Sequence, residues 1–529
     1  MRRTRVKSPP MSLGSQVMKM VGTRVRAIRA PGPSTIFFLL VGVLASAPAW
    51  IVRHPPLQDM PFHLATIRVI HDFSDPALGF QADYELNLAH TAYIFYYLLG
   101  TLFAYVLGAY KANVLLMSLY LGGTPLALRE FLVALKKDER LALFSVPLVV
   151  NVMFLYGLMP FVFGIPVMFL TMAAAVRWFE KPTENRGIWL GVLAVALFYS
   201  HVFPYGVFGV AFAAMFPWSK PREYVRMALP VLPSLLAVLW WVKFSPAGSA
   251  AAKGFGGSAG LGPAPPQPLD ASLTQFFDWS TNVFLDQSDE KWFIALVVIG
   301  VVSMGLAQGE PDSSIRRSRP YVAVLVACIA CYFLLGDHLG DVWLLAQRFP
   351  VPALLCAIPL LRIPRGMKGT AVAFAALLIG IGSTVNVCQH FIRFEREEVG
   401  SLDDAIDSMK PGKKVCGLIY DKGSSITRNV PFLHYVSYYQ AEKGGVVMFS
   451  YAHYPHWPFR YLEGHTPPPG TSPRLRWEWT PEQTPMNEIY PYYDYVLVRG
   501  GGWSAPPGTY HMAFHDGRWS VWERDGATP

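Results

Sequence analysis

The sequence has little charge and little cysteine. Only 15% of its 529 residues are charged, whereas charged residues make up about 25% of a typical soluble domain. This scarcity excludes a disordered chain and a conventional soluble enzyme. The five cysteines are too few for a disulfide framework, and four of them stand in apolar runs, where cysteine usually packs as a small hydrophobic residue.

Long apolar runs take the place of charge, and 52% of the residues are hydrophobic. A helix needs about 20 apolar residues to cross the hydrocarbon core of a bilayer. The sequence therefore predicts a polytopic α-helical membrane protein with about eleven spans. The predicted spans are residues 35–52, 112–134, 141–157, 163–179, 187–202, 204–217, 224–244, 291–308, 320–336, 342–361 and 369–388.

The net charge of +9 is unevenly distributed along the chain. Residues 390–529 hold 14 basic and 16 acidic side chains, whereas residues 1–34 hold eight basic side chains and no acid. Basic segments on the cytoplasmic side of a membrane explain this pattern better than a nucleic-acid-binding face. The sequence thus predicts a multi-pass protein of a bacterial inner membrane with a basic cytoplasmic N-terminus at 1–34, and no nucleic-acid partner.

One more apolar run, residues 92–108, either forms a twelfth span or lies along the outer interface. A full crossing would place the later basic loops on the wrong side of the membrane, so the interfacial position is preferred. The transmembrane domain then covers residues 35–389. It contains a long outer loop at 53–111 and a flexible outer loop at 245–290, whose first part is rich in Gly, Ala, Pro and Ser.

Residues 390–529 have the pattern of a small soluble α/β domain, which this topology delivers to the periplasm. A helix is predicted at 403–409. Strands are predicted at 414–421, 446–451 and 493–498, with a hairpin at 510–523 around Asp516-Gly517. The aromatic stretch 451–457 either stacks on sugar rings or covers a small core near the membrane.

The stretch from His54 to His63 places a carboxylate and two imidazoles just after the first predicted span. Pro61 is suited to the first turn of a helix, and Asp59 could cap that helix. His63 would then lie about one turn beyond Asp59. Two interpretations follow: Asp59 is only a helix cap, or it is a functional carboxylate with His63 as its partner.

A cation stands near the start of the tenth predicted span. A charge in a span costs a few kcal/mol unless it is paired or solvated, which makes Arg348 a candidate site residue. Its guanidinium could hold a phosphate with two hydrogen bonds. The alternatives are an ion pair with Asp337 or Asp341, or extension of the side chain to the interface. Three more residues at predicted outer helix ends are either substrate-binding residues or interfacial anchors: His201, Lys243 and His338.

The whole pattern resembles the GT-C membrane glycosyltransferases, which use polyprenyl-phosphate-linked sugar donors. The shared features are an acid early in a long first outer loop, juxtamembrane helices, many further spans and an outer α/β domain. In that family an acid of the first outer loop sits at the catalytic centre, and the matching position is Asp59. The resemblance implies that Asp59 is the base. His63, one turn away, is then a candidate catalytic partner, and Arg348 is a candidate for binding the donor phosphate.

The sequence departs from the family pattern in its next outer loop. Many relatives carry a second acid there, but residues 156–164 contain neither an acid nor a histidine. A two-acid, metal-assisted mechanism is therefore in doubt, although Asp83 or Glu85 could substitute. No cofactor is assigned with certainty, and a divalent metal is left open.

The predicted function is transfer of a sugar from a polyprenyl-phosphate donor to a glycan, lipid or protein acceptor at the outer face of the membrane. Two other functions are compatible with the sequence. One is a polytopic transporter or lipid flippase, which should carry ionisable residues deep in several spans. The other is a non-catalytic membrane scaffold whose outer domain binds a partner.

Overall fold

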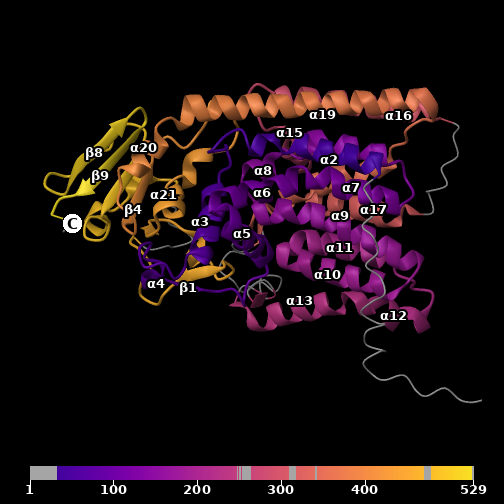
Figure 1. Cartoon of the computed structure of the whole chain (residues 1–529), viewed down its shortest axis with the longest axis horizontal. Helices are drawn as coiled ribbons and strands as arrows, with labels where there is room; N and C mark the ends of the chain where they lie inside the picture. The colour runs from indigo at the N-terminus through magenta and orange to yellow at the C-terminus, as the bar shows by residue number, and fades with distance from the viewer. Residues whose placement is uncertain are drawn as a thin grey trace, which may run out of the picture.

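The computed structural model describes residues 32–246, 248–249, 252, 264–308, 317–339, 342–469 and 478–526. In this part of the chain the protein is a layered stack of helices with a small sheet domain at one end (Figure 1). Most of the predicted basic N-terminus and the Gly-rich centre of the 245–290 loop lie outside the described residues.

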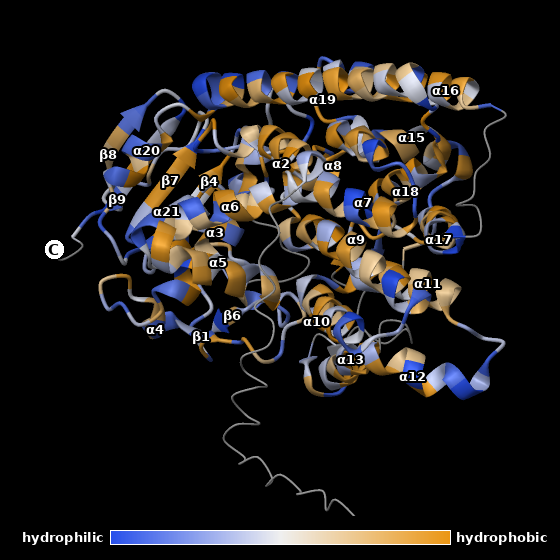
Figure 2. Ribbon diagram, turned by 45° about the vertical axis from the view of Figure 1, so that its right-hand side comes forward, coloured by the Kyte–Doolittle hydropathy of each residue, from blue (hydrophilic) through white to orange (hydrophobic). Residues whose placement is uncertain are grey.

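The helical stack carries most of the apolar residues of the chain (Figure 2). Its helices are α2 (Pro33–Ala45), α3 (Met60–His71), α4 (Phe80–Asp83), α5 (Ile94–Leu107), α6 (Ala109–Leu121), α7 (Gly123–Ala134), α8 (Val152–Leu155), α9 (Met159–Glu180), α10 (Glu184–Ser200), α11 (Val202–Met215), α12 (Tyr224–Ala228), α13 (Leu232–Phe244), α15 (Leu269–Thr281), α16 (Ser288–Leu306), α17 (Arg319–Leu334), α18 (Pro350–Ala357) and α19 (Gly366–Phe394).

Three of the described helices are long and apolar enough to cross a membrane, namely Met159–Glu180, Pro221–Phe244 and Gly366–Val399. Other predicted spans are shorter or interrupted. Residues 141–157 do not form one continuous α-helix: a 3₁₀ segment (Glu139–Leu148) contains Pro147, and α8 follows after a break. Proline lacks the backbone N–H that a continuous helix needs at this position. The number of spans therefore stays a prediction.

Part of the predicted flexible loop at 245–290 is helical. Residues 269–281 form helix α15, which packs against α8 and α18. The Tyr332 hydroxyl on α17 donates to the Ser272 carbonyl at 2.9 Å. This part of the loop is thus a packed element beside the stack.

The C-terminal domain contains the α/β structure that the sequence predicts. Strands β5 and β7 flank β4 as parallel neighbours, and β9 and β8 extend the sheet antiparallel in the order β5-β4-β7-β9-β8. The elements are α20 (Leu402–Asp407), β4 (Lys414–Ile419), α21 (Ser437–Lys443), β5 (Val446–Val447), α22 (Met486–Ile489), β7 (Tyr495–Arg499), β8 (Tyr510–Asp516) and β9 (Trp519–Arg524). The central strands β4 and β7 are apolar and buried (Figure 2).

Residues 53–111 and the C-terminal domain are packed into one unit. Strand β1 (Tyr84–Leu86) pairs antiparallel with β6 (Phe459–Tyr461), and α21 packs against α3. The predicted boundary at residue 390 falls inside a helix, because α19 runs to Phe394 and continues as a π-helix through Val399 (Figure 1).

Both ends of α5 contact the same side of the molecule. Before the helix, the Thr91 hydroxyl donates to the His456 carbonyl in the C-terminal domain. After it, the Tyr110 hydroxyl donates to the backbone oxygen of Arg53, whose side chain pairs with Glu442 of the same domain. A 14-residue helix is about 21 Å long, shorter than the roughly 30 Å hydrocarbon core. The interfacial position of residues 92–108 stays a prediction.

Candidate active site

Asp59 stands at the N-cap position of α3 but does not cap it. Pro61 occupies the first turn, as predicted, and no side-chain capping bond forms. The carboxylate instead accepts hydrogen bonds from His434 Nδ1, at 3.0 Å from Oδ1, and from the Tyr451 hydroxyl, at 2.8 Å from Oδ2. The interpretation of Asp59 as only a helix cap is therefore wrong. Asp59 is 6% exposed, and its carboxylate bonds to the C-terminal domain instead of its own helix.

The loop between α8 and α9 fixes the backbone at Asp59. The Asp59 N–H donates to the Tyr156 carbonyl at 3.2 Å. Gly157 has φ +74°, and a Cβ placed on it would lie 2.7 Å from the Asp59 nitrogen. Only glycine adopts this conformation readily and allows so close an approach. The loop thus contributes backbone support, although it carries no acid.

His63 lies one turn into α3, and it contacts the same loop but not the Asp59 carboxylate. Its Nε2 is 2.8 Å from the Gly157 carbonyl, and its Nδ1 is 2.8 Å from the Tyr97 hydroxyl on α5. A carbonyl only accepts, so Nε2 carries the proton and Nδ1 accepts from Tyr97. Burial lowers the pKa of His63 to about 4, against the attraction of Asp59. His63 is therefore a neutral side chain whose hydrogen bonds join α3 to α5 and to the α8–α9 loop.

Aromatic rings enclose the Asp59 carboxylate. The Phe62 ring lies 4.4 Å from the rings of both His434 and Tyr451. Burial and the negative charge of Asp59 hold the pKa of the Tyr451 hydroxyl well above its usual value, so this hydroxyl stays a donor. We call Asp59, Phe62, His434 and Tyr451 the Asp59 cluster.

Arg348 is partly exposed and is held by groups without negative charge. Its Nε and Nη2 donate to the Leu344 and Trp343 carbonyls at 3.2 and 3.0 Å. Its guanidinium carbon lies over the Phe203 and Phe161 rings, at 5.1 and 5.5 Å from their centroids. Within the described part of the chain no carboxylate pairs with it.

Of the two alternative ion-pair partners of Arg348, Asp337 contacts its neighbour His338 instead, at 2.9 Å. Asp341 lies outside the described residues, so an ion pair with it stays a prediction.

The structure brings His201 to Arg348. His201 Nε2 is 3.4 Å from Arg348 Nη1, and the His201 ring packs 4.7 Å from Tyr93. The Tyr93 ring in turn lies 5.5 Å from His456, which belongs to the aromatic stretch 451–457. The charges of Asp59 and Arg348 are near enough to interact electrostatically.

Two predicted substrate-binding residues have no contact with this group among the described residues. Lys243 is exposed on α13, with its Nζ 5.2 Å from the ring centroid of Phe244. His338 lies in the hairpin formed by β2 (His338–Leu339) and β3 (Val342–Trp343), and its ring packs on Trp343. Their roles stay predictions.

The two acids proposed as substitutes for a second family acid are bound elsewhere. Asp83 Oδ1 is 3.2 Å from His465 Nδ1, and Glu85 pairs with Arg460 across the β1–β6 ladder at 2.5 Å. Neither contacts Asp59. The partners that Asp59 does have, His434 and Tyr451, were not predicted for it. Tyr451 begins the aromatic stretch noted in the sequence, whereas nothing in the local sequence around His434 distinguishes it.

A cavity of about 260 Å³ adjoins the same loop. Its wall includes Tyr156, Trp279, Asn282 and Asn429, contributed by the α8–α9 loop, α15 and the C-terminal domain. The Asn429 amide donates to the Pro56 and Leu155 carbonyls, both at 2.9 Å. Asn429 therefore connects the cavity wall to the segment that leads to Asp59.

Comparison with solved structures identifies the fold class of the protein. No protein-family model and no curated protein sequence matches the chain. Two crystal structures of ArnT from Cupriavidus metallidurans do match in three dimensions. The structure bound to undecaprenyl phosphate has a TM-score of 0.55 at 11% identity, and covers 93% of this chain and 99% of its own. The apo structure has a TM-score of 0.53 at 10% identity, and covers 92% of this chain and 97% of its own. The predicted GT-C fold is confirmed in its ArnT-like form.

Proposed function

We propose that the protein is a membrane glycosyltransferase that transfers a sugar from a polyprenyl-phosphate donor to an acceptor at the outer face of a bacterial inner membrane. The observation that carries this proposal is a buried carboxylate, Asp59, whose charge interacts with that of Arg348, a cation that pairs with no carboxylate in the described part of the chain. The ArnT-like fold supports it, since one of the matching ArnT structures holds undecaprenyl phosphate.

The residues suit a displacement at the anomeric carbon of the donor. An acceptor oxygen or nitrogen forms the new bond to that carbon while the bond from carbon to the phosphate oxygen breaks. The proton of the acceptor passes to Asp59, and the polyprenyl phosphate leaves with the bonding electron pair. Arg348 binds the phosphate and stabilises the charge that grows on it.

The two oxygens of Asp59 have separate roles in this proposal. His434 holds Oδ1 and fixes the carboxylate in the C-terminal domain. The Tyr451 hydroxyl lies on Oδ2 and marks the position that the acceptor hydroxyl or amine takes. The neighbouring rings of Tyr93, His456 and Trp457 form apolar faces suited to a sugar.

The surface of the stack supports a membrane location. Large apolar side chains are exposed on α2, α13 and α16, and each of these helices presents several of them. Exposed apolar area of this extent is expected where lipid covers a protein. We place residues 53–111 and 390–529 on the periplasmic side and the basic N-terminus in the cytoplasm.

Turnover by purified protein in lipid nanodiscs tests the proposal, with a panel of polyprenyl-phosphate sugars and radiolabelled acceptors. Asp59→Asn should lower kcat by roughly 10²–10⁴-fold. Arg348→Gln should raise the KM for the donor by roughly 10- to 100-fold, the loss expected for a charge-assisted hydrogen bond.

Two exposed residues provide matched controls, Asp75→Asn on the same outer loop and Arg393→Gln on α19. Both variants should keep wild-type kinetics. Wild-type transfer by Asp59→Asn would show that Asp59 is not the base. Lipid movement between leaflets without any transfer would replace the proposed activity with that of a flippase.

A further inference from the structure

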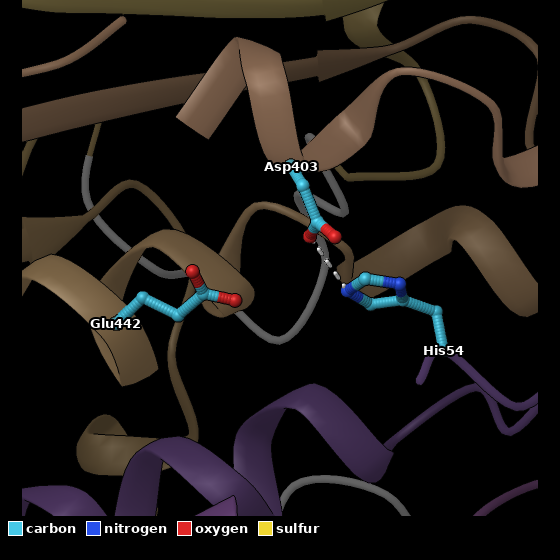
Figure 3. Close-up of side chains that lie close together, drawn as sticks. All are labelled: His54, Asp403 and Glu442. Carbon is cyan, nitrogen blue, oxygen red and sulfur yellow. Dashed lines mark ion pairs between the residues drawn. The ribbon is translucent and has the colours of Figure 1, made fainter. Parts of the chain in front are cut away.

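A cluster of side chains that could hold a metal ion lies apart from the Asp59 cluster. It joins His54, just after the first predicted span, to Asp403 on α20 and Glu442 on α21 (Figure 3). One ligand atom from each residue can be chosen so that all three lie within 4.8 Å of one another. The His54 ring points at the Asp403 carboxylate, and the Glu442 carboxylate points toward the same space (Figure 3).

His54 has an unsatisfied nitrogen at the centre of this cluster. The residue is 2% exposed, and its Nε2 is buried without a hydrogen bond, although it lies 3.3 Å from Asp403 Oδ1. Asp403 Oδ1 is also buried without a hydrogen-bond donor. Buried polar atoms usually have partners, and leaving one without costs about 1–3 kcal/mol. With the ring proton on Nδ1, which faces Glu395 Oε1 at 3.7 Å, His54 presents a lone pair at Nε2, and Asp403 Oδ1 presents another beside it.

The cluster carries a net negative charge. Glu395 accepts the backbone N–H groups of Arg53 and His54 and brings a third carboxylate to the side of Asp403 and Glu442. Arg53 is the cation that contacts these carboxylates, with Nη1 3.4 Å from Asp403 and Nη2 2.9 Å from Glu442. Arg53 offsets only one of the three negative charges, so the cluster stays net negative whether or not this side chain remains in place, and its charge favours a divalent cation.

We propose that His54 Nε2, Asp403 and Glu442 bind a Zn²⁺ ion. One imidazole nitrogen with two carboxylate oxygens is a ligand set that zinc accepts, at about 2.0–2.2 Å from each atom. Small rotations of the two carboxylates close the site, and the half-exposed Arg53 side chain swings into solvent when the ion enters. The ion ties the segment that leads to Asp59 to two helices of the C-terminal domain.

Zinc titration of the full-length protein tests the site. The protein is purified in detergent, stripped with EDTA and titrated with Zn²⁺ by calorimetry, and its Tm is followed in parallel. Wild type should bind the ion and gain Tm. His54→Ala and the isosteric Asp403→Asn should each weaken binding at least tenfold. His511→Ala is the matched control, because His511 also contacts a carboxylate, Asp525, at 2.8 Å, but in an exposed pair of the same domain.

Arg53→Gln provides a test in which the expected result is tighter binding, which a misfolded variant would not show. Removing the competing cation should tighten zinc binding several-fold, because the two carboxylates then face the ion alone. Wild-type affinity in both His54→Ala and Asp403→Asn would overturn the proposal, and so would weaker binding by Arg53→Gln. Co²⁺ in place of Zn²⁺ should give visible absorption bands in wild type, and His54→Ala should abolish them.

Discussion

At the scale of single residues, Asp59 is held by side chains from the other end of the sequence. His434 and Tyr451 are 375 and 392 positions away, yet each occupies one of its oxygens. Charge-assisted hydrogen bonds of this kind are strong and depend closely on geometry. The position of the carboxylate is therefore set by the C-terminal domain as much as by α3.

Substitutions at the two partners should have different effects on turnover. His434→Ala should lower kcat by roughly 10- to 100-fold, because a buried charge loses a hydrogen bond worth about 1.5–3 kcal/mol. Tyr451→Phe should cost less than tenfold, because the acceptor takes the place of this hydroxyl in the reaction. Steady-state kinetics at saturating donor measures both. If His434→Ala were as inactive as Asp59→Asn, His434 itself would be the group that takes the proton.

The neutral state of His63 makes the stability of the protein depend on pH. Its pKa is lowered from 6.5 to about 4 by burial. Between these values the unfolded chain binds a proton that the folded chain does not, so stability is full above pH 6.5 and falls as the pH falls toward 4. The Tm should drop across this window, and His63→Gln should make the drop shallower. His511→Gln, at an exposed position, should leave the wild-type slope; an unchanged slope in His63→Gln would contradict the prediction.

At the scale of elements, the start of α3 and the α8–α9 loop form one rigid support. Two backbone N–H groups, those of Gln58 and Asp59, donate to the carbonyls of Leu155 and Tyr156. His63 adds a third bond to the Gly157 carbonyl. The apolar residues Leu64 and Ile67 on the next turns are buried by α3 packing against α5, α6 and α21. Hydrogen bonds to the backbone of the α8–α9 loop therefore position Asp59, although the loop contributes no charged side chain.

Gly157→Ala should damage this support. The added Cβ would lie 2.7 Å from the Asp59 nitrogen and 2.9 Å from the Met60 nitrogen, at a φ of +74°. A left-handed alanine costs roughly 1–2 kcal/mol before any clash, and α3 must shift. We expect a lower Tm and at least a tenfold loss of kcat, measured on detergent-purified protein.

Gly206→Ala is the control for that substitution, because this helical glycine on α11 has open space around its Cβ position. It should leave the Tm unchanged or raise it. Equal behaviour of the two variants would mean that the loop does not position Asp59.

At the scale of the whole molecule, residues 53–111 and the C-terminal domain lie on one side of the helical stack. The β1–β6 ladder and the contacts of Arg53 and Asp59 all join them. A segment that crossed the membrane at 92–108 would separate Tyr93 from Tyr110, yet both contact partners on this same side. The shared side is a property of the structure, and its assignment to the periplasm is our proposal.

A disulfide across the ladder tests both statements. Glu85 and Arg460 are register partners, and antiparallel partners have Cα separations of about 4.5–5.5 Å, within reach of a disulfide. Glu85→Cys with Arg460→Cys should therefore cross-link in living cells, where the periplasm is oxidising. Maleimide–polyethylene glycol gel shifts measure the free thiols.

The pair Glu85→Cys with Arg524→Cys is the control and should stay reduced, because Arg524 lies on β9 in the five-stranded sheet. A cross-link that forms only after oxidation of purified protein would support the pairing and place the domain in the cytosol. That result would contradict the proposed topology.

The sequence alone determined the features that depend on neighbouring residues. Apolar runs predicted the helical stack, Pro61 predicted the start of α3, and runs of β-branched and aromatic residues predicted the strands of the C-terminal sheet. These features follow from hydrophobic burial and backbone preference over a few turns. The tertiary structure decided which groups meet: Asp59 with His434 and Tyr451, Arg348 with His201, and His54 with Asp403 and Glu442. Such pairs join distant parts of the chain, so they depend on how the elements pack and not on any local pattern.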